Sequence, residues 1–323
     1  MTTGSQLGVV ASQIRDVPIA VIDIETTGLH PGADRVVEVS VVRLEPAREP
    51  ALVLDTLLNP QRPVAATEIH GITDRDVADA PAFSAIAGDL ARALSDAVLT
   101  AYNVYFDVRF LADEFSRVGW AGTMPHLCLM YMRPMLGLGR KCCLSDACRA
   151  HGIEHLEAHT AAYDALAGAR LWEFYAEVML QKGVRTFGDI ASLKAYKFSE
   201  SLNLPPLSPD AARSMPSGGR LKPRHPGVGH APVPSRADLV HEYWDAVTAA
   251  VMDLDLSDTE IRDLADKRER FSLTNEELRA VHGRVFAAML SEVLADSFVT
   301  DAEWKQLKRL HDCLRQLGWA PGT

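Results

Sequence analysis

Apolar and polar positions form alternating blocks in the first 60 residues, and these blocks predict three strands. Residues 19–25, Val36–Leu44 and 52–57 are apolar and rich in β-branched side chains, as strands are. Turns with glycine or proline separate them. Because the connections are short, we expect an antiparallel meander.

From Pro81 onward the apolar positions recur at helical spacing. The first such helix has four apolar side chains on one face, Phe83, Ile86, Leu90 and Leu94. A short strand at 97–101 follows, and further helices are predicted at 106–118, 144–151 and 161–180. Strands followed by alternating helix and strand indicate an α/β or α+β layer with a mixed sheet.

Residues 205–236 interrupt the pattern with eight prolines and four glycines and show no apolar period. The segment carries five basic side chains and one acidic side chain, a net charge of +4. A solvated linker is one interpretation. A basic arm that contacts nucleic acid is the other.

Residues 237–321 form a second, helical unit with an internal repeat at an offset of 43 residues. Ser257 with Glu260, and Thr300 with Glu303, have the spacing of a helix capping box. The repeat therefore predicts two similar helical hairpins. A calcium loop starting at Asp253 is excluded, because Asp258 stands where glycine is needed and Leu264 where a bidentate glutamate is needed.

The composition indicates a soluble globular chain with a net charge of −10. Such a charge argues against a protein that coats nucleic acid, but not against an enzyme that binds a strand end locally. No apolar run approaches the roughly 18–20 residues of a membrane span. The five cysteines, with no export signal before them, are most simply reduced thiols of a cytoplasmic protein.

Asp23 and Glu25 lie two residues apart at the end of the first predicted strand. Residues i and i+2 of a strand point to the same side. Two carboxylates held together at the end of a buried strand are costly unless cations compensate them. A divalent metal site explains the pair, and surface acids at a strand end are the alternative.

Asp107 and Asp164 each fall in the first turn of a predicted helix. An isolated acid there is usually a capping residue or interacts with the helix dipole. His159 and Asp164 are five residues apart, so they cannot share a helix face. A joint role requires His159 in the loop before the helix.

Four motifs together resemble one family, the DEDDh exonucleases, which include the proofreading subunit of bacterial replicative polymerase. The motifs are Asp-Ile-Glu-Thr-Thr-Gly-Leu at 23–29, Ile-His-Gly-Ile-Thr at 69–73, Asn-Val-Tyr-Phe-Asp at 103–107 and His-x4-Asp at 159–164. The resemblance covers about residues 17–180. The order and spacing of the four motifs make the resemblance specific.

The resemblance implies an α/β, RNase H-like fold with a mixed five-stranded sheet flanked by helices, and 3′-to-5′ hydrolysis of nucleic acid. Four carboxylates, those of Asp23, Glu25, Asp107 and Asp164, would hold two Mg²⁺ or Mn²⁺ ions, and His159 would be the general base. Oxygen ligands suit hard cations, and two such ions can stabilise both oxygens of an in-line phosphoryl displacement.

The resemblance also implies contacts with the 3′ end of DNA or RNA. Thr26, Thr27, Leu29, His70 and Asn103 would line the path of the strand, with an ordinary turn at 26–28 and a loop cap at His70 as alternatives. The basic residues Arg133, Arg140, Lys141 and Arg149 form either a phosphate-facing strip or solvated surface.

The expected domains are a tail at 1–16, the exonuclease domain at 17–180, a helical extension at 181–204, the linker at 205–236 and a small all-α domain at 237–321. This last domain weakly resembles TerB-like domains and carries 17 acidic and 10 basic residues up to position 323. We expect it to bind a protein partner or a second copy. Two alternatives to a DNA exonuclease are an RNA-trimming exoribonuclease and a polymerase-associated or nucleic-acid-binding adaptor with little nuclease activity.

Overall fold

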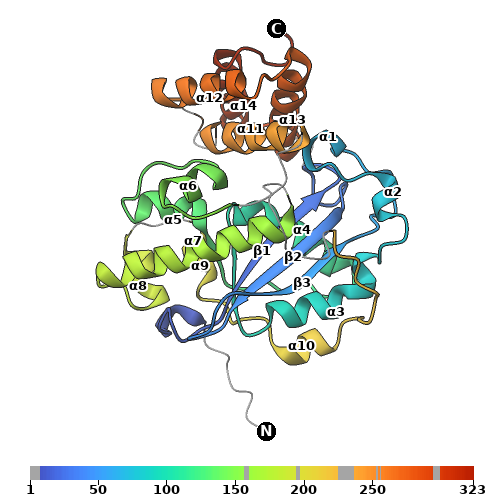
Figure 1. The fold of residues 1–323 in the computed structure, drawn as a ribbon, viewed down its shortest axis with the longest axis vertical. Coiled ribbons are helices and arrows are strands. Elements are labelled where there is room, and N and C mark those ends of the chain that lie inside the picture. The colour runs from blue at the N-terminus through green and yellow to red at the C-terminus, as the bar shows by residue number, and fades with distance from the viewer. Residues whose placement is uncertain are drawn as a thin grey trace.

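The computed structural model describes residues 8–155, 160–193, 197–224, 236–251, 254, 256–293 and 299–323. Figure 1 shows a domain built around one sheet, with the C-terminal helices α11 to α14 stacked at one end of it. No helix in these ranges is long and apolar enough to cross a membrane.

The sheet has five strands in the order β3-β2-β1-β4-β5. The strands are β1 Ile19–Thr26, β2 Val36–Leu44, β3 Ala51–Leu57, β4 Val98–Ala101 and β5 His126–Cys128. The first three pair as an antiparallel meander, while β4 and β5 run parallel to β1. The predicted mixed five-stranded sheet flanked by helices is confirmed. The resemblance implied five strands, but the position of β5 was not predicted, because three residues are too few to show a period.

Three long helices pack on the sheet: α3 Phe83–Leu94, α4 Val104–Arg117 and α7 Ala161–Gln181. All three were predicted. Helix α7 crosses β1 and β2, as Figure 1 shows. At their crossing stands Gly168, where an added Cβ would lie 3.0 Å from the Val21 side chain. A larger residue here would therefore force the helix or the Val21 side chain to shift by a few tenths of an ångström.

Shorter helices fill the connections of this domain. Helix α5 contains Pro134, which obscured its periodicity. The set is η1 Val9–Ala11, α1 Thr67–His70, α2 Asp74–Val77, α5 Leu129–Met135, α6 Leu144–Ala150, α8 Phe187–Leu193 and α9 Lys197–Ser201.

The first part of the expected linker lies against the exonuclease domain. It forms helix α10, Pro209–Arg213, which packs on α3. The side chains of Leu207, Ala212 and Met215 are buried in the domain core. Single apolar side chains between prolines anchor this segment, and such anchors leave no periodic pattern in the sequence. Of the expected linker, only residues 225–235 lie outside the described residues.

The C-terminal domain consists of α11 Arg236–Val251, α12 Asp258–Arg270, α13 Asn275–Val293 and α14 Asp301–Gln316. Both predicted capping boxes are present, at Ser257 with Glu260 and at Thr300 with Glu303. The domain has a hydrophobic core of its own, which includes Val247, Leu278 and Leu314.

A buried ion pair joins the turn after β1 to helix α4. Arg35 donates from Nε and Nη2 to the two carboxylate oxygens of Glu114, at 2.6 and 2.8 Å. The Glu114 side chain is 1% exposed. Paired donation of this kind is strong, and removing one partner leaves a charge buried without compensation.

We predict that Arg35→Ala lowers the free energy of unfolding by about 3–5 kcal/mol, because Glu114 then stays buried alone. Urea unfolding followed by circular dichroism measures the change. The matched control is Arg15→Ala, whose ion pair with Glu177 is more than half exposed and is worth at most about 1 kcal/mol. Equal effects of the two substitutions would contradict the prediction.

Candidate active site

A cavity at the carboxyl ends of β1 and β4 collects the four acids singled out in the sequence. Asp23 and Glu25 come from β1, Asp107 from the first turn of α4 and Asp164 from the first turn of α7, and all four line this cavity. Three separate segments thus bring four carboxylates to one place.

The cavity is an unfavourable environment for negative charge. Glu25, Asp107 and Asp164 are 5–8% exposed. Burial, followed by the charges of Asp164, Asp107 and Glu25, raises the pKa of Asp23 well above its usual value. Burial also raises the pKa of Asp107 to about 8, although the backbone amide of Ile24 donates a hydrogen bond that opposes the rise.

Such a cluster fits divalent cations. Four carboxylates balance the charge of two divalent ions, and an all-oxygen donor set suits hard cations such as Mg²⁺ and Mn²⁺. The raised pKa values express the cost of gathering these anions without positive charge among them.

One histidine that the sequence did not single out contacts the cluster. His155 lies 2.5 Å from Asp164, measured from Nε2 to Oδ1, and its Nδ1 lies 3.2 Å from the Ser145 hydroxyl. His155 thereby fixes the Asp164 carboxylate. Nine residues separate the two in the chain, so no motif linked them. His159, the expected general base, lies outside the described residues.

The turn after β1 is held by Asp34. Its carboxylate accepts hydrogen bonds from the Thr27 hydroxyl at 3.0 Å and from the His30 amide at 3.0 Å. Thr26 and Leu29 line the cavity, whereas Thr27 is not among its lining residues. Of this expected substrate-contacting turn, two members therefore face the site.

His70 and Asn103 also line the cavity, but with different hydrogen bonding. The His70 ring accepts from the Ile72 amide at 3.0 Å and lies 3.2 Å from the Ala65 carbonyl, so both nitrogens are used within its own turn. Burial first, then His241, lowers the pKa of His70 to about 3. By contrast, the buried Oδ1 of Asn103 has no hydrogen-bond partner within the described ranges, as expected for a ligand-binding group.

Arg224 neutralises a further acid beside the site. Glu38 is opposite Glu25 on the neighbouring strand and is fully buried. Burial raises the pKa of Glu38 to about 7, although Arg224 opposes the rise by donating to it at 3.1 Å. Arg224 also donates to the His70 carbonyl at 2.7 Å. The charge and composition of residues 205–236 predict a solvated linker or an arm that contacts nucleic acid, whereas the Arg224 side chain pairs with a buried acid of the exonuclease domain.

The four basic residues of the expected strip do not line this cavity. Arg133 donates to the Arg140 carbonyl and Lys141 lies over the Tyr131 ring. Arg140 and Arg149 face acidic side chains of the C-terminal domain. The strip therefore does not face the carboxylate cluster, and the Arg140 and Arg149 side chains remain more than half exposed.

The C-terminal domain contributes residues that the sequence did not suggest. Helix α11 places His241, Trp244, Asp245 and Thr248 in the lining of the cavity. His241 Nδ1 lies 3.8 Å from Glu25 Oε1. The only available signal was the spacing of His241 and Asp245, which puts them on one helix face.

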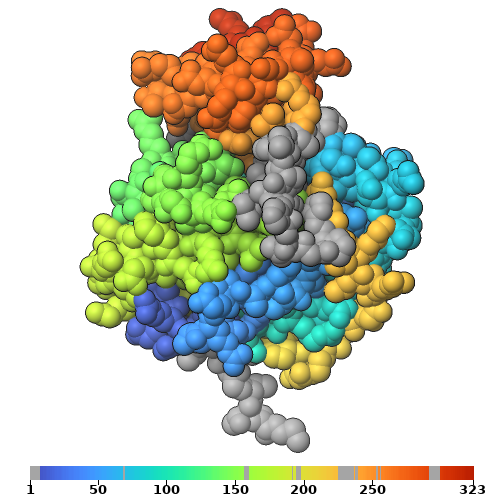
Figure 2. Space-filling view, in the orientation of Figure 1, coloured from blue at the N-terminus to red at the C-terminus, as the bar shows by residue number. Residues whose placement is uncertain are grey.

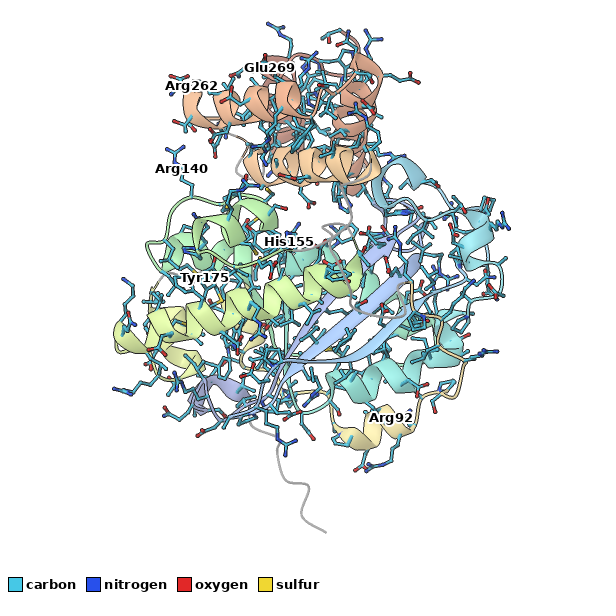
Figure 3. All side chains as sticks on the ribbon, in the orientation of Figure 1. Arg92, Arg140, His155, Tyr175, Arg262 and Glu269 are labelled. Carbon is cyan, nitrogen blue, oxygen red and sulfur yellow. The ribbon has the colours of Figure 1, made fainter. Side chains whose placement is uncertain are left out.

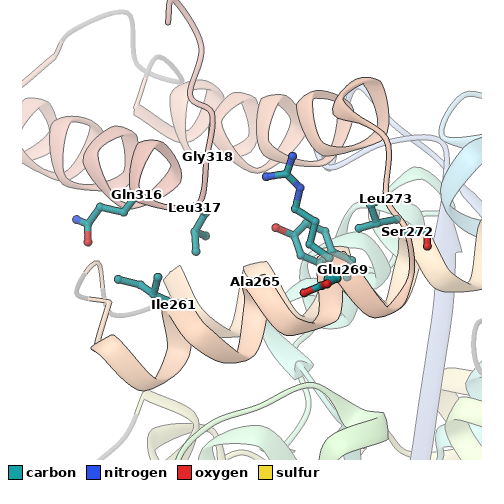
Figure 4. A pocket seen from close by; sticks show the side chains of 10 residues that line it. Ile261, Ala265, Glu269, Ser272, Leu273, Gln316, Leu317 and Gly318 are labelled. Atoms are coloured by element: carbon teal, nitrogen blue, oxygen red, sulfur yellow. The ribbon is translucent and has the colours of Figure 1, made fainter.

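A separate groove of about 630 Å³ lies within the C-terminal domain (Figure 4). Ile261, Ala265, Leu273 and Leu317 supply its apolar lining, and Arg268 and Glu269 its charges. Its lining contains one carboxylate, so it does not offer the acidic cluster that the cavity beside β1 does.

Comparison with known proteins agrees with the motifs. Residues 20–172 match the model of the RNase_T exonuclease family. A DNA polymerase III subunit epsilon-like protein of Rhodobacter capsulatus is 32% identical over 194 residues, which cover 58% of this chain and 28% of that protein. The DNA polymerase III epsilon subunit of Rickettsia prowazekii is 33% identical over 108 residues, which cover 32% of this chain and 46% of that protein.

Among solved structures, Escherichia coli exonuclease I in complex with a dT13 oligonucleotide matches with a TM-score of 0.43 and 20% identity, covering 52% of this chain and 42% of that one. The chain spans less than half the length of each of these relatives. The family match, the motifs and the sheet order concern the same part of the chain. Residues 20–172, which contain all four DEDDh-type motifs, therefore match the RNase_T exonuclease family.

Proposed function

We propose that this protein is a divalent-metal-dependent exonuclease that removes nucleotides from the 3′ end of a nucleic acid, with DNA as the favoured substrate. The observation that carries the proposal is the gathering of Asp23, Glu25, Asp107 and Asp164 in one cavity. One relative named as a DNA polymerase III subunit epsilon-like protein and another named as the epsilon subunit support DNA as the favoured substrate.

Each group of residues has a distinct task in this proposal. The four carboxylates would hold two Mg²⁺ or Mn²⁺ ions, which when bound would stabilise the attacking and leaving oxygens of the phosphodiester. His159 would accept the proton of the attacking water, as a neutral imidazole can near pH 7. Thr26, Leu29 and Asn103 would position the terminal nucleotide, and His155 would orient Asp164.

Two other functions make different demands on the same site. An adaptor that only binds nucleic acid would gain nothing from a costly acidic cluster, because carboxylates repel phosphate. An exoribonuclease would use the same cluster, and the 2′-hydroxyl is what a protein contacts to distinguish RNA from DNA. The chemistry of the cavity thus favours a nuclease.

Progressive shortening of a 5′-labelled single-stranded oligonucleotide with Mn²⁺ present tests the activity. With wild-type protein we expect a ladder of shortened products. Asp23→Ala should lower the rate by at least about 1,000-fold, because it removes a ligand of the metal ions that would compensate the negative charge of the transition state. Asp16→Ala, an exposed acid before β1, is the matched control. Matched DNA and RNA strands decide the substrate class. No shortening by wild type, or unchanged shortening by Asp23→Ala, would disprove the proposal.

The two histidines should affect different kinetic constants. His159→Ala should lower kcat by about 10²- to 10⁴-fold at saturating Mn²⁺, because a general base is lost. His155→Ala should raise the Mn²⁺ concentration for half-maximal rate by about 10- to 100-fold with little change in kcat, because it only orients a ligand. His311→Ala, in α14, is the control. If His155→Ala lowered kcat at saturating metal and His159→Ala did not, the roles would be reversed.

Metal binding should also be visible without catalysis. In wild type, Mn²⁺ at 100 times its Kd should add about 2.7 kcal/mol to the free energy of unfolding. The double variant Asp23→Asn, Asp107→Asn should lose this response, yet be more stable than wild type in EDTA because two repelling acids are gone. Thermal unfolding with EDTA or Mn²⁺ measures both effects. An equal response to Mn²⁺ in both proteins would show that the ions bind elsewhere.

A further inference from the structure

Helix α11 of the C-terminal domain lies over the carboxylate cavity. Its side chains His241 and Asp245 are one helical turn apart and so share a face. His241 lies 3.8 Å from Glu25 and 3.7 Å from Asp245. The Trp244 ring meets the Phe106 ring edge to face, with centroids 6.4 Å apart, and α1 packs along the same helix.

Polar contacts between the two domains surround this helix. Arg140 donates to the Ser257 hydroxyl at 2.5 Å and lies 3.6 Å from Glu260. Figure 3 shows Arg140 extending from the exonuclease domain toward α12, and the space-filling view in Figure 2 shows the two domains meeting there.

A second polar contact is centred on Lys267, which is 7% exposed. Its Nζ lies 3.2 Å from Asp146 of the exonuclease domain and 2.8 Å from Glu242 of α11. These two acids and Cys143 lie close enough together to resemble a metal site, but the lysine already supplies the positive charge. The contact is therefore an inter-domain ion pair.

The cavity under α11 is too small for a nucleotide. Its volume is about 110 Å³, whereas sites for small ligands start at roughly 300 Å³. The Asp245 side chain also lines the cavity beside the four acids and offers no positive charge to a phosphate group. A strand end cannot occupy the cavity while α11 is in place.

The contact is also imperfectly matched. Trp244 Nε1 and Thr248 Oγ1 on α11, and Asn103 Oδ1 opposite them, are buried without a hydrogen-bond partner in the part of the chain that the structure describes. Each such group costs about 1–3 kcal/mol. Separation of the domains would return these groups to solvent or offer Asn103 to a substrate. The unpaired groups therefore weaken the contact between α11 and the exonuclease domain.

From these contacts we infer that the C-terminal domain is an intramolecular inhibitor of the exonuclease site, with α11 competing directly with the nucleic-acid strand for the cavity. The inference rests on the proposed function, because it concerns regulation of that site. The strand and α11 exclude each other, so weakening the α11 contact raises the fraction of protein able to bind.

Substitutions on the buried face of α11 test this inference in the full chain. Trp244→Ala removes the contact with Phe106. Ala249→Glu places a charge at a residue that is 4% exposed and packs into the exonuclease core. We expect either variant to lower KM for a single-stranded oligonucleotide by about 3- to 10-fold with kcat unchanged. A change of this size corresponds to the loss of one aromatic contact between α11 and the exonuclease domain.

The matched controls are Trp304→Ala and Ala302→Glu in α14, since Trp304 is 63% exposed and Ala302 is also exposed. Both should behave as wild type, and thermal unfolding checks that every variant folds. Unchanged or raised KM in both α11 variants would overturn the inference, because α11 would then be inert or part of the substrate site.

A binding measurement separates this inference from the proposed function. Fluorescence anisotropy with a labelled oligonucleotide in EDTA needs no catalysis, and both α11 variants should bind about 3- to 10-fold tighter than wild type. If the variants bind the strand more tightly, but neither they nor wild type shorten it, the inference about the C-terminal domain holds and the exonuclease proposal is wrong. If wild type shortens the strand and the variants bind it no more tightly, only the inhibitor fails.

Discussion

The structure depends on one electrostatic constraint: four carboxylates from three segments meet in a cavity that excludes most water. Asp23 and Glu25 reach it because β1 is a central strand, and Asp107 and Asp164 because α4 and α7 begin beside it. Positive charge must enter such a place before negative oxygens can stay together. Divalent ions would meet that need and, in the proposed function, would also supply the chemistry of phosphodiester cleavage.

The protein's own cations are placed around the cavity rather than inside it. Arg224 compensates Glu38 behind Glu25, Arg35 compensates Glu114, and Lys267 joins two acids across the domain contact. Asp245 of α11 adds a further acid beside the carboxylates that face the cavity. In the proposed function this division would let divalent ions supply the positive charge through which an acidic chain binds a polyanion at one point.

The sequence predicted those parts of the structure that have local signals. Periodicity located four strands and three long helices, and the Ser257 and Thr300 capping boxes marked two helix starts. Contacts between distant segments had no such signal. His155 touches Asp164 from outside α7, Arg224 reaches Glu38 from a proline-rich segment, and α11 lies over acids that stand far before it in the sequence. Each depends on tertiary packing, which composition and spacing do not encode.

Gly168 links the packing of the domain to the geometry of its cavity. It lies one helical turn after Asp164 on α7 and lets that helix approach Val21, two residues before Asp23. The distance between this helix and this strand thereby contributes to the distance between two carboxylates. A methyl group here would force the helix or the Val21 side chain to shift by a few tenths of an ångström. A single hydrogen atom outside the cavity thus helps to set how closely two of its acids approach.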